Sequence, residues 1–254
     1  MLPASMRPVT RFALALVLGQ MATARAEDLP PELVARPATL PHGVVALTLA
    51  GGYDSAHVLG IPVLSATTLG VLLQRGMTSR LELSLGTSFA LHPDAGWTRD
   101  GSFALAYRAL QYDSLELAPA LTVPLSFRSG ADITSTIVLG AGLRWHVTPC
   151  VLVVVGQRLL PLPVRPAVAF DVGADAAVTV QLAQRWAVVA QAVLGEVTIA
   201  GQTDRGVAPW HHLASLARIV YAAQHSIDVM LEVHGDARDP RNEAGVAMSV
   251  TRRM

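Results

Sequence analysis

The chain has 254 residues, of which 52% are hydrophobic and only 15% are charged, and its mean hydropathy is +0.42. Charged residues make up about a quarter of a typical soluble domain, so the composition favours a membrane protein. A transmembrane helix needs roughly 20 consecutive apolar residues, and no such run follows the N-terminal region. The formal net charge of zero argues against a nucleic-acid partner. The single cysteine excludes an internal disulfide and a cysteine-based metal cluster.

Residues 1–26 show the features of a secretory signal peptide in the expected order. Arg7 and Arg11 precede the short apolar stretch FALALVLGQMATA, and Ala24-Arg25-Ala26 then supplies a small-x-small cleavage site. We expect cleavage near Ala26 and export from the cytoplasm. The alternative, a retained membrane anchor, is disfavoured because the apolar stretch is short for a span.

Residues 27–42, EDLPPELVARPATLPH, are rich in proline and show no periodicity. We expect them to form an extended N-terminal segment on the periplasmic side of a membrane domain that spans 43–254.

The next segments alternate apolar and polar residues with a period of two. In 78–91 leucine, threonine and phenylalanine take one parity, whereas Arg80, Glu82 and small residues take the other. Such alternation indicates a strand with two chemically different faces. The same pattern recurs at 114–127, 134–147, 166–182, 226–234 and 245–251.

Weaker strand patterns fill the gaps, so the count reaches about twelve strands, within a range of about 10 to 14. These weaker segments are 43–53, 66–77, 102–111, 150–159, 185–199 and 212–223. Tight turns are predicted at 77–79, 111–113, 147–149, 183–184 and 223–225. Longer links are predicted at 54–65, 92–101, 128–132, 160–165, 200–211 and 236–242. Alternating short and long connections are typical of an outer-membrane barrel, whose periplasmic turns are short.

The predicted fold is therefore all-β, a single antiparallel up-and-down transmembrane β-barrel. Lipid requires the apolar face, and closure is required because an open sheet edge cannot be satisfied in hydrocarbon. Trp145, Trp186, Tyr112 and Tyr221 lie near strand ends beside the short turns, where an interfacial girdle belongs. The alternative is a soluble β-sandwich or lipocalin-like barrel. Large aromatic residues would usually fill its core, and only 5% of this chain is aromatic.

The signal peptide, the lead RPATLPHG at 36–43 and the repeated strands together resemble porin-like outer-membrane β-barrel proteins of Gram-negative bacteria. The resemblance implies residence in the bacterial outer membrane, with outer-membrane lipid and the barrel-assembly machinery as partners. Barrels of this kind usually end in an aromatic residue, whereas this chain ends in SVTRRM.

Charged residues on the polar parity are the candidates for lining a lumen. These lumen-lining candidates are Arg80, Glu82, Arg108, Glu116, Arg144, His146, Asp171, Asp175, Arg218, Asp228, Glu232 and His234. They predict either a water-filled path with an ion preference or pairs that close the lumen. Many other positions on this parity are small, which favours a passage for small hydrophilic solutes or ions. The alternative is a closed barrel whose extracellular loops have a structural or adhesive role.

An outer-membrane hydrolase is the third possibility. Its best cluster is Asp204, His211, His212 and Ser215. On a strand, however, His212 and Ser215 would face opposite sides, as would the two histidines, which does not suit a catalytic triad or a metal pair. We therefore expect no enzyme activity, no cofactor and no metal.

Overall fold

The computed structural model describes residues 29–58, 61–92, 99–126, 136–156, 161–163, 169–199, 210–236 and 243–254. Its elements are, in chain order, a 3-10 helix at Leu33–Ala35, β1 (Val45–Val58), β2 (Ile61–Gly76), β3 (Leu81–His92), β4 (Arg99–Tyr107), β5 (Leu110–Tyr112), β6 (Leu115–Ser126), β7 (Thr136–Thr148), β8 (Val151–Val155), β9 (Pro161–Pro163), β10 (Ala169–Ala183), β11 (Trp186–Ile199), β12 (Trp210–Gln224), β13 (Ile227–Asp236) and β14 (Glu243–Arg253). No helix in these ranges is long and apolar enough to cross a membrane.

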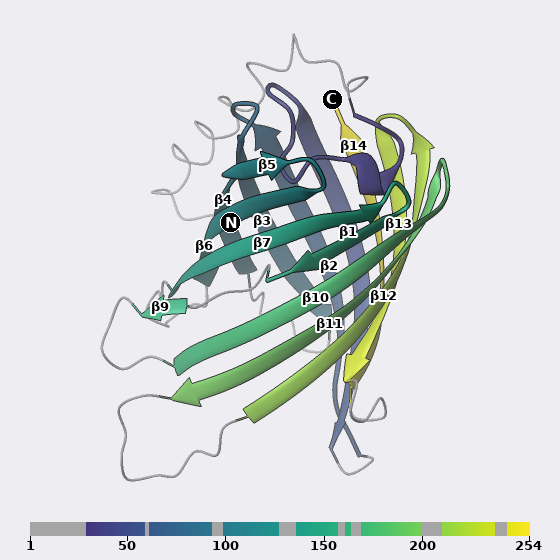
Figure 1. The fold of residues 1–254 in the computed structure, drawn as a ribbon. Helices are drawn as coiled ribbons and strands as arrows, with labels where there is room; N and C mark the ends of the chain where they lie inside the picture. The colour runs from purple at the N-terminus through teal and green to yellow at the C-terminus, as the bar shows by residue number, and fades with distance from the viewer. Residues whose placement is uncertain are drawn as a thin grey trace, which may run out of the picture.

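The strands form one closed antiparallel sheet (Figure 1). β1 pairs with β14 from Ala46↔Arg253 to Ala56↔Glu243, so the first and last long strands lie side by side. The other long strands pair with their neighbours along the chain, and the β6–β7 pairing completes the ring. Within the described ranges the wall has twelve strand positions, because β8 and β9 both pair with β7 and share one position, and β5 is an extra strand on β6. This confirms the predicted barrel.

The apolar parity of the strands faces outward. Leu49, Leu231, Val233 and Met248 are each more than half exposed. The polar parity faces the interior, where Glu82 and Glu116 are only 7% and 5% exposed. A soluble β-domain would bury the leucine and valine rows, because apolar burial drives its folding. An apolar exterior around a polar interior instead suits a barrel that stands in lipid.

The short turns lie at one end of the barrel, together with the C-terminus and the residues that lead into β1 (Figure 1). Val45 and Met254 exchange two backbone hydrogen bonds there, of 2.9 and 2.8 Å. In a barrel of the predicted orientation this end faces the periplasm. Trp145 and Trp186 are about half exposed near these turns, and the rings of Trp186 and Tyr221 lie 4.5 Å apart.

Several predicted segments differ in the structure, among them the link expected at 160–165, which contains the short strand β9. The link expected at 54–65 is mostly strand, because β1 and β2 stay paired as far as Val58↔Ile61 through a register shift at Ala56/His57. The strand expected at 102–111 is divided into β4 and β5, so β6 pairs first with one and then with the other. The strand expected at 150–159 ends at Val155, because Gly156 adopts a φ of 79° that few other residues tolerate.

Candidate functional site: the lumen and its N-terminal segment

Residues 29–44, here called the N-terminal segment, lie against the inner wall at the short-turn end of the barrel. Leu29, Val34, Thr39 and Val44 are among the most buried side chains of the described chain, at 1–3% exposure. The segment contacts β3, β6, β7, β8, β10 and β13 through the interactions given below, and it contacts β2 through the Gly43 N–H, which donates to the Gly76 carbonyl oxygen at 2.8 Å. It therefore crosses the mouth of the lumen.

An apolar contact anchors the beginning of the segment. Val34, in the 3-10 helix, packs with Leu152 and Val154, which face inward from β8, and Ala177 of β10 lies against this cluster. The Val34 N–H donates to Gln181 Oε1 of β10 at 3.4 Å. The contact removes Val34 from water, and complete burial of a valine side chain contributes about 1.5–3 kcal/mol.

Two carboxylates of the barrel wall hold the middle of the segment. Glu116 Oε2 accepts a hydrogen bond from Ala38 N at 3.0 Å, and Glu82 Oε2 accepts one from Leu40 N at 2.8 Å. Pro37 and Pro41 have no N–H, so the segment cannot join the sheet as a regular strand. Buried backbone N–H groups still need acceptors, and the two glutamates supply them.

A cluster of three charged side chains fixes the segment to β13 and β14, next to the pairing of β1 with β14 that closes the barrel. Arg36 makes a two-pronged contact with Asp228 of β13, with Nη1–Oδ2 at 2.6 Å and Nη2–Oδ1 at 3.0 Å. Arg253 of β14 forms an ion pair with the same carboxylate. Burial lowers the pKa of Arg36 to about 10, against the opposing effect of Glu32. Arg36 therefore stays charged at neutral pH, and Asp228 serves two cations.

A second group of charges surrounds Glu116. Arg108 Nη1 lies 3.9 Å from Glu116 Oε1, and Arg144 Nη1 lies 3.7 Å from Glu116 Oε2. Arg144 also donates from Nη2 to the carbonyl oxygen of Arg36 at 2.9 Å. Glu116 and Arg144 thus bind the segment from neighbouring strands, one as acceptor and one as donor.

Further from the mouth, polar side chains pair across neighbouring strands of the wall. Arg218 Nε of β12 lies 2.6 Å from Glu232 Oε2 of β13, and His234 Nδ1 lies 3.2 Å from Glu232 Oε1. Gln191 Nε2 of β11 donates to Asp175 Oδ2 of β10 at 2.8 Å. These contacts pair the polar and charged side chains of β10 to β13 with one another.

Most of the predicted lumen residues occupy the inner wall, with three exceptions. Arg80 is exposed in the turn between β2 and β3, because β3 begins only at Leu81, so its placement on the wall is wrong. Arg108 lies between β4 and β5 and reaches the lumen mouth only through its side chain. Asp171 lies outside the residues whose side chains the structure describes. His146 is half-buried at an inward position of β7.

Sequence reasoning missed Arg36, whose pairing with Asp228 ties the segment to the wall. An arginine in a proline-rich segment, between apolar residues, was the available signal, but it names no partner.

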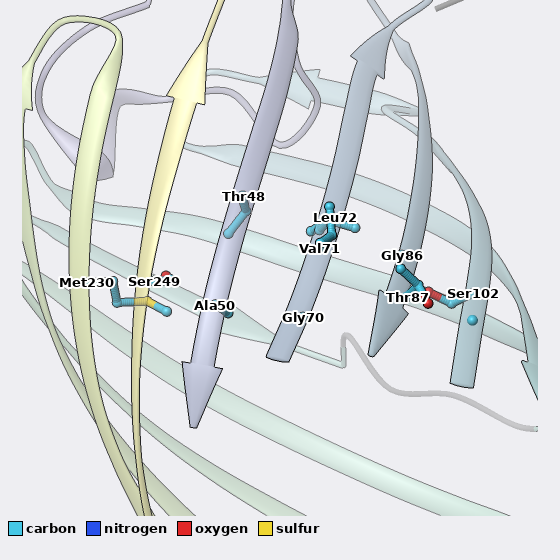
Figure 2. Close-up of a pocket in the computed structure, with 11 residues that line it drawn as sticks. Thr48, Ala50, Gly70, Val71, Leu72, Gly86, Thr87, Ser102, Met230 and Ser249 are labelled. Carbon is cyan, nitrogen blue, oxygen red and sulfur yellow. The ribbon is translucent and has the colours of Figure 1, made fainter. Parts of the chain in front are cut away.

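The inner wall also has a hollow of about 420 Å³ (Figure 2). Its inward-facing residues come from β1, β2, β3, β4, β13 and β14 and include Thr48, Ala50, Gly70, Leu72, Met230 and Ser249. None of the residues that line it is charged. The inner wall therefore includes a recess that is lined by small, apolar and hydroxyl-bearing residues without a charged side chain among them.

The residues considered for hydrolysis give no site in the described chain. Asp204 lies outside the described residues, and the side chains of His211, His212 and Ser215 are likewise not described. Among the side chains that are described, no group of three histidine, cysteine, aspartate or glutamate residues could hold a metal ion.

Comparison with known proteins places the fold among outer-membrane barrels. No protein-family model and no curated protein matches the chain. The NanC porin structure matches with a TM-score of 0.62 and 13% identity over 81% of this chain and 98% of that chain. KdgM porin in complex with disordered oligogalacturonate matches with a TM-score of 0.59 and 8% identity, over 82% of this chain and 98% of that chain. The COG4313 outer membrane channel from Pseudomonas putida F1 matches with a TM-score of 0.57 and 16% identity, over 87% of this chain and 100% of that chain. At these identities the likeness shows the fold alone.

Proposed function

We propose that the protein is a porin-like passive channel of the bacterial outer membrane, for small hydrophilic solutes or ions, whose periplasmic mouth is narrowed by the N-terminal segment. The observation that carries the proposal is the closed barrel with its apolar exterior and polar inner wall. The similarity of the fold to the NanC and KdgM porins and to the COG4313 channel supports it. Export of the chain after cleavage near Ala26, and insertion by the barrel-assembly machinery, belong to the same proposal.

The size of the barrel leaves room for a passage. Side chains fill the interior of a barrel of about eight strands, and barrels of about sixteen strands enclose an aqueous channel. A barrel of intermediate size depends on the side chains that point inward. Gly70, Gly86, Gly140 and Gly142 occupy inward positions of three strands, β2, β3 and β7. Because glycine has no side chain, these positions leave space in the lumen. We therefore propose that the path for a solute is narrowest at the N-terminal segment.

A second function is favoured by the way the segment is fastened. The segment contacts seven strands, more than a loosely held segment would, so the competing proposal is a permanently closed barrel with a structural or adhesive role through its extracellular loops.

Conductance across a planar bilayer separates the two. The full chain is expected to give a small, steady conductance, and a variant that lacks 29–42 is expected to give a conductance several-fold larger. Each preparation is first shown to be folded by its shift in gel mobility on boiling. If both folded proteins fail to conduct, the channel proposal is wrong. Equal conductance of the two would show that the segment does not narrow the path.

A further inference from the structure

We infer that the hollow in the inner wall, whose lining residues are uncharged, is a binding site for a neutral molecule that combines an aliphatic part with hydroxyl groups. The inference rests on the proposed function, since such a ligand must enter the lumen. It narrows the solutes from small hydrophilic molecules in general to uncharged ones with an apolar part.

The shape of the hollow comes from small residues on adjacent strands. Ala50 pairs with Gly70 across β1 and β2, and a Cβ at Gly70 would have only the Ala50 Cβ, at 3.8 Å, and the Thr87 carbonyl oxygen, at 3.9 Å, within 4 Å. The neighbouring Leu72 and Met230 are larger and form the sides (Figure 2). The wall is therefore recessed at Ala50 and Gly70 and open to the lumen.

The lining of the hollow combines apolar surface with hydroxyl groups. Ala50, Leu72 and Met230 offer aliphatic carbon and sulfur, whereas Thr48 and Ser249 carry hydroxyls at its edge. Thr48 Oγ1 lies 2.7 Å from Thr251 Oγ1 in a hydrogen bond, and either oxygen retains a lone pair for another donor. An aliphatic group gains from leaving water here, and a hydroxyl group on the same molecule finds partners nearby.

The charges of the lumen do not compete for this ligand. Asp228 and Glu232 lie two residues to either side of Met230 on the same face of β13, but Glu232 pairs with Arg218, and Asp228 pairs with Arg36 and Arg253. A charged solute in the hollow would lose water without meeting an opposite charge among the lining residues, which is costly. A volume of about 420 Å³ falls in the range of about 300–1,000 Å³ typical of small-molecule sites.

Methionine methyl NMR tests the inference directly. The full chain, labelled with ¹³C at the methionine methyl groups, is placed in lipid nanodiscs and titrated with n-hexyl β-D-glucoside. Met230 lines the hollow, whereas Met248 faces outward and is 55% exposed, so it reports partitioning of the probe into lipid. We expect a saturable shift of the Met230 resonance. Sodium hexanoate has a similar aliphatic chain but carries a charge, and glucose has the hydroxyl groups without the aliphatic chain. Both should shift the Met230 resonance far less.

Matched substitutions complete the test. Ala50→Leu fills the hollow and is expected to weaken binding roughly ten-fold or more. Ala190→Leu makes the same change on the lipid side of β11 and should leave binding unaltered. An unmoved Met230 resonance, an equal response to hexanoate, or equal effects of the two substitutions would overturn the inference. Because this readout needs no ion flow, a protein that binds the glucoside but does not conduct would refute the channel and not the site.

Discussion

Asp228 should matter more to stability than either of the arginines that it binds. The variant Asp228→Asn removes the charge of the carboxylate, and Arg36→Met removes the charge of one arginine. Both substitutions change the shape of the side chain little. In Arg36→Met the carboxylate keeps Arg253 as a partner, so the variant loses charge-assisted hydrogen bonds worth about 1.5–3 kcal/mol. In Asp228→Asn two buried guanidinium groups face each other without a carboxylate. Breaking a buried pair in this way costs about 3–5 kcal/mol.

The burial of the cluster supports the larger of these figures. The side chains of Arg36 and Asp228 are 11% and 10% exposed, and that of Arg253 is 5% exposed, so water screens the charges weakly. Arg36 also donates to the carbonyl oxygens of Pro30 and Pro31, at 3.1 and 3.0 Å, which keeps its guanidinium in place near Arg253.

Urea unfolding in lipid vesicles, followed by tryptophan fluorescence, measures both variants. With a slope of about 2 kcal/mol per molar urea, Asp228→Asn should lower the midpoint by roughly 2 M, and Arg36→Met by about half as much. The reasoning is refuted if Arg36→Met costs as much as Asp228→Asn, or if Asp228→Asn unfolds at the midpoint of the unaltered protein.

Three further outcomes follow from the same contacts. Gly76→Ala places a Cβ against the carbonyl oxygens of Leu40 and Pro41 and should displace the N-terminal segment, which bilayer recordings would show as a larger conductance; Gly51→Ala, on the outward parity of β1, whose Cβ meets only ordinary contacts of 3.6 Å and more, should leave the conductance nearly unchanged. Glu82→Leu removes the acceptor of Leu40 N and Gln74 Nε2 and should lower the free energy of unfolding by about 1–3 kcal/mol in urea titrations, whereas Ser84→Ala, which removes one donor at 3.1 Å, should cost less. Gly156→Ala should cost about 1–3 kcal/mol in the same titration because of its φ of 79° and because its Cβ would lie 2.9 Å from the Ala141 carbonyl oxygen; a variant as stable as the unaltered chain would contradict this.

The barrel could be predicted from the sequence because its main determinant is local. Along β3, apolar residues such as Leu83 and Leu85 alternate with polar neighbours. Every strand of the barrel needs this alternation, because one of its faces meets lipid and the other meets the lumen. The ends of the strands were harder to predict from the sequence. Arg80 has the parity of the inner wall but lies in a turn, because the start of β3 depends on pairing with β2 and not on the pattern alone.

The site depends on contacts that no local pattern encodes. Arg36 and Asp228 are 192 positions apart, and Ala38 and Glu116 are 78 apart. The carboxylates were predicted as lumen residues from their parity, but their role as acceptors for backbone N–H groups appears only when the segment is seated in the mouth. The hollow likewise depends on glycine and alanine meeting across strands, in a register that the sequence does not fix.

Cysteine pairing tests the central claim, that the N-terminal segment occupies the mouth of the barrel. Val34→Cys and Leu152→Cys are combined in a Cys150→Ser background, and cells that export the full chain are analysed on gels with and without reductant. Val34 packs against the inward-facing Leu152, whereas the neighbouring Val153 lies on the outward parity of β8. We expect a disulfide in the pair with Leu152→Cys and none in the pair with Val153→Cys. Equal cross-linking of both pairs, or of neither, would contradict the account, because a segment free in the periplasm would not distinguish the two faces of β8.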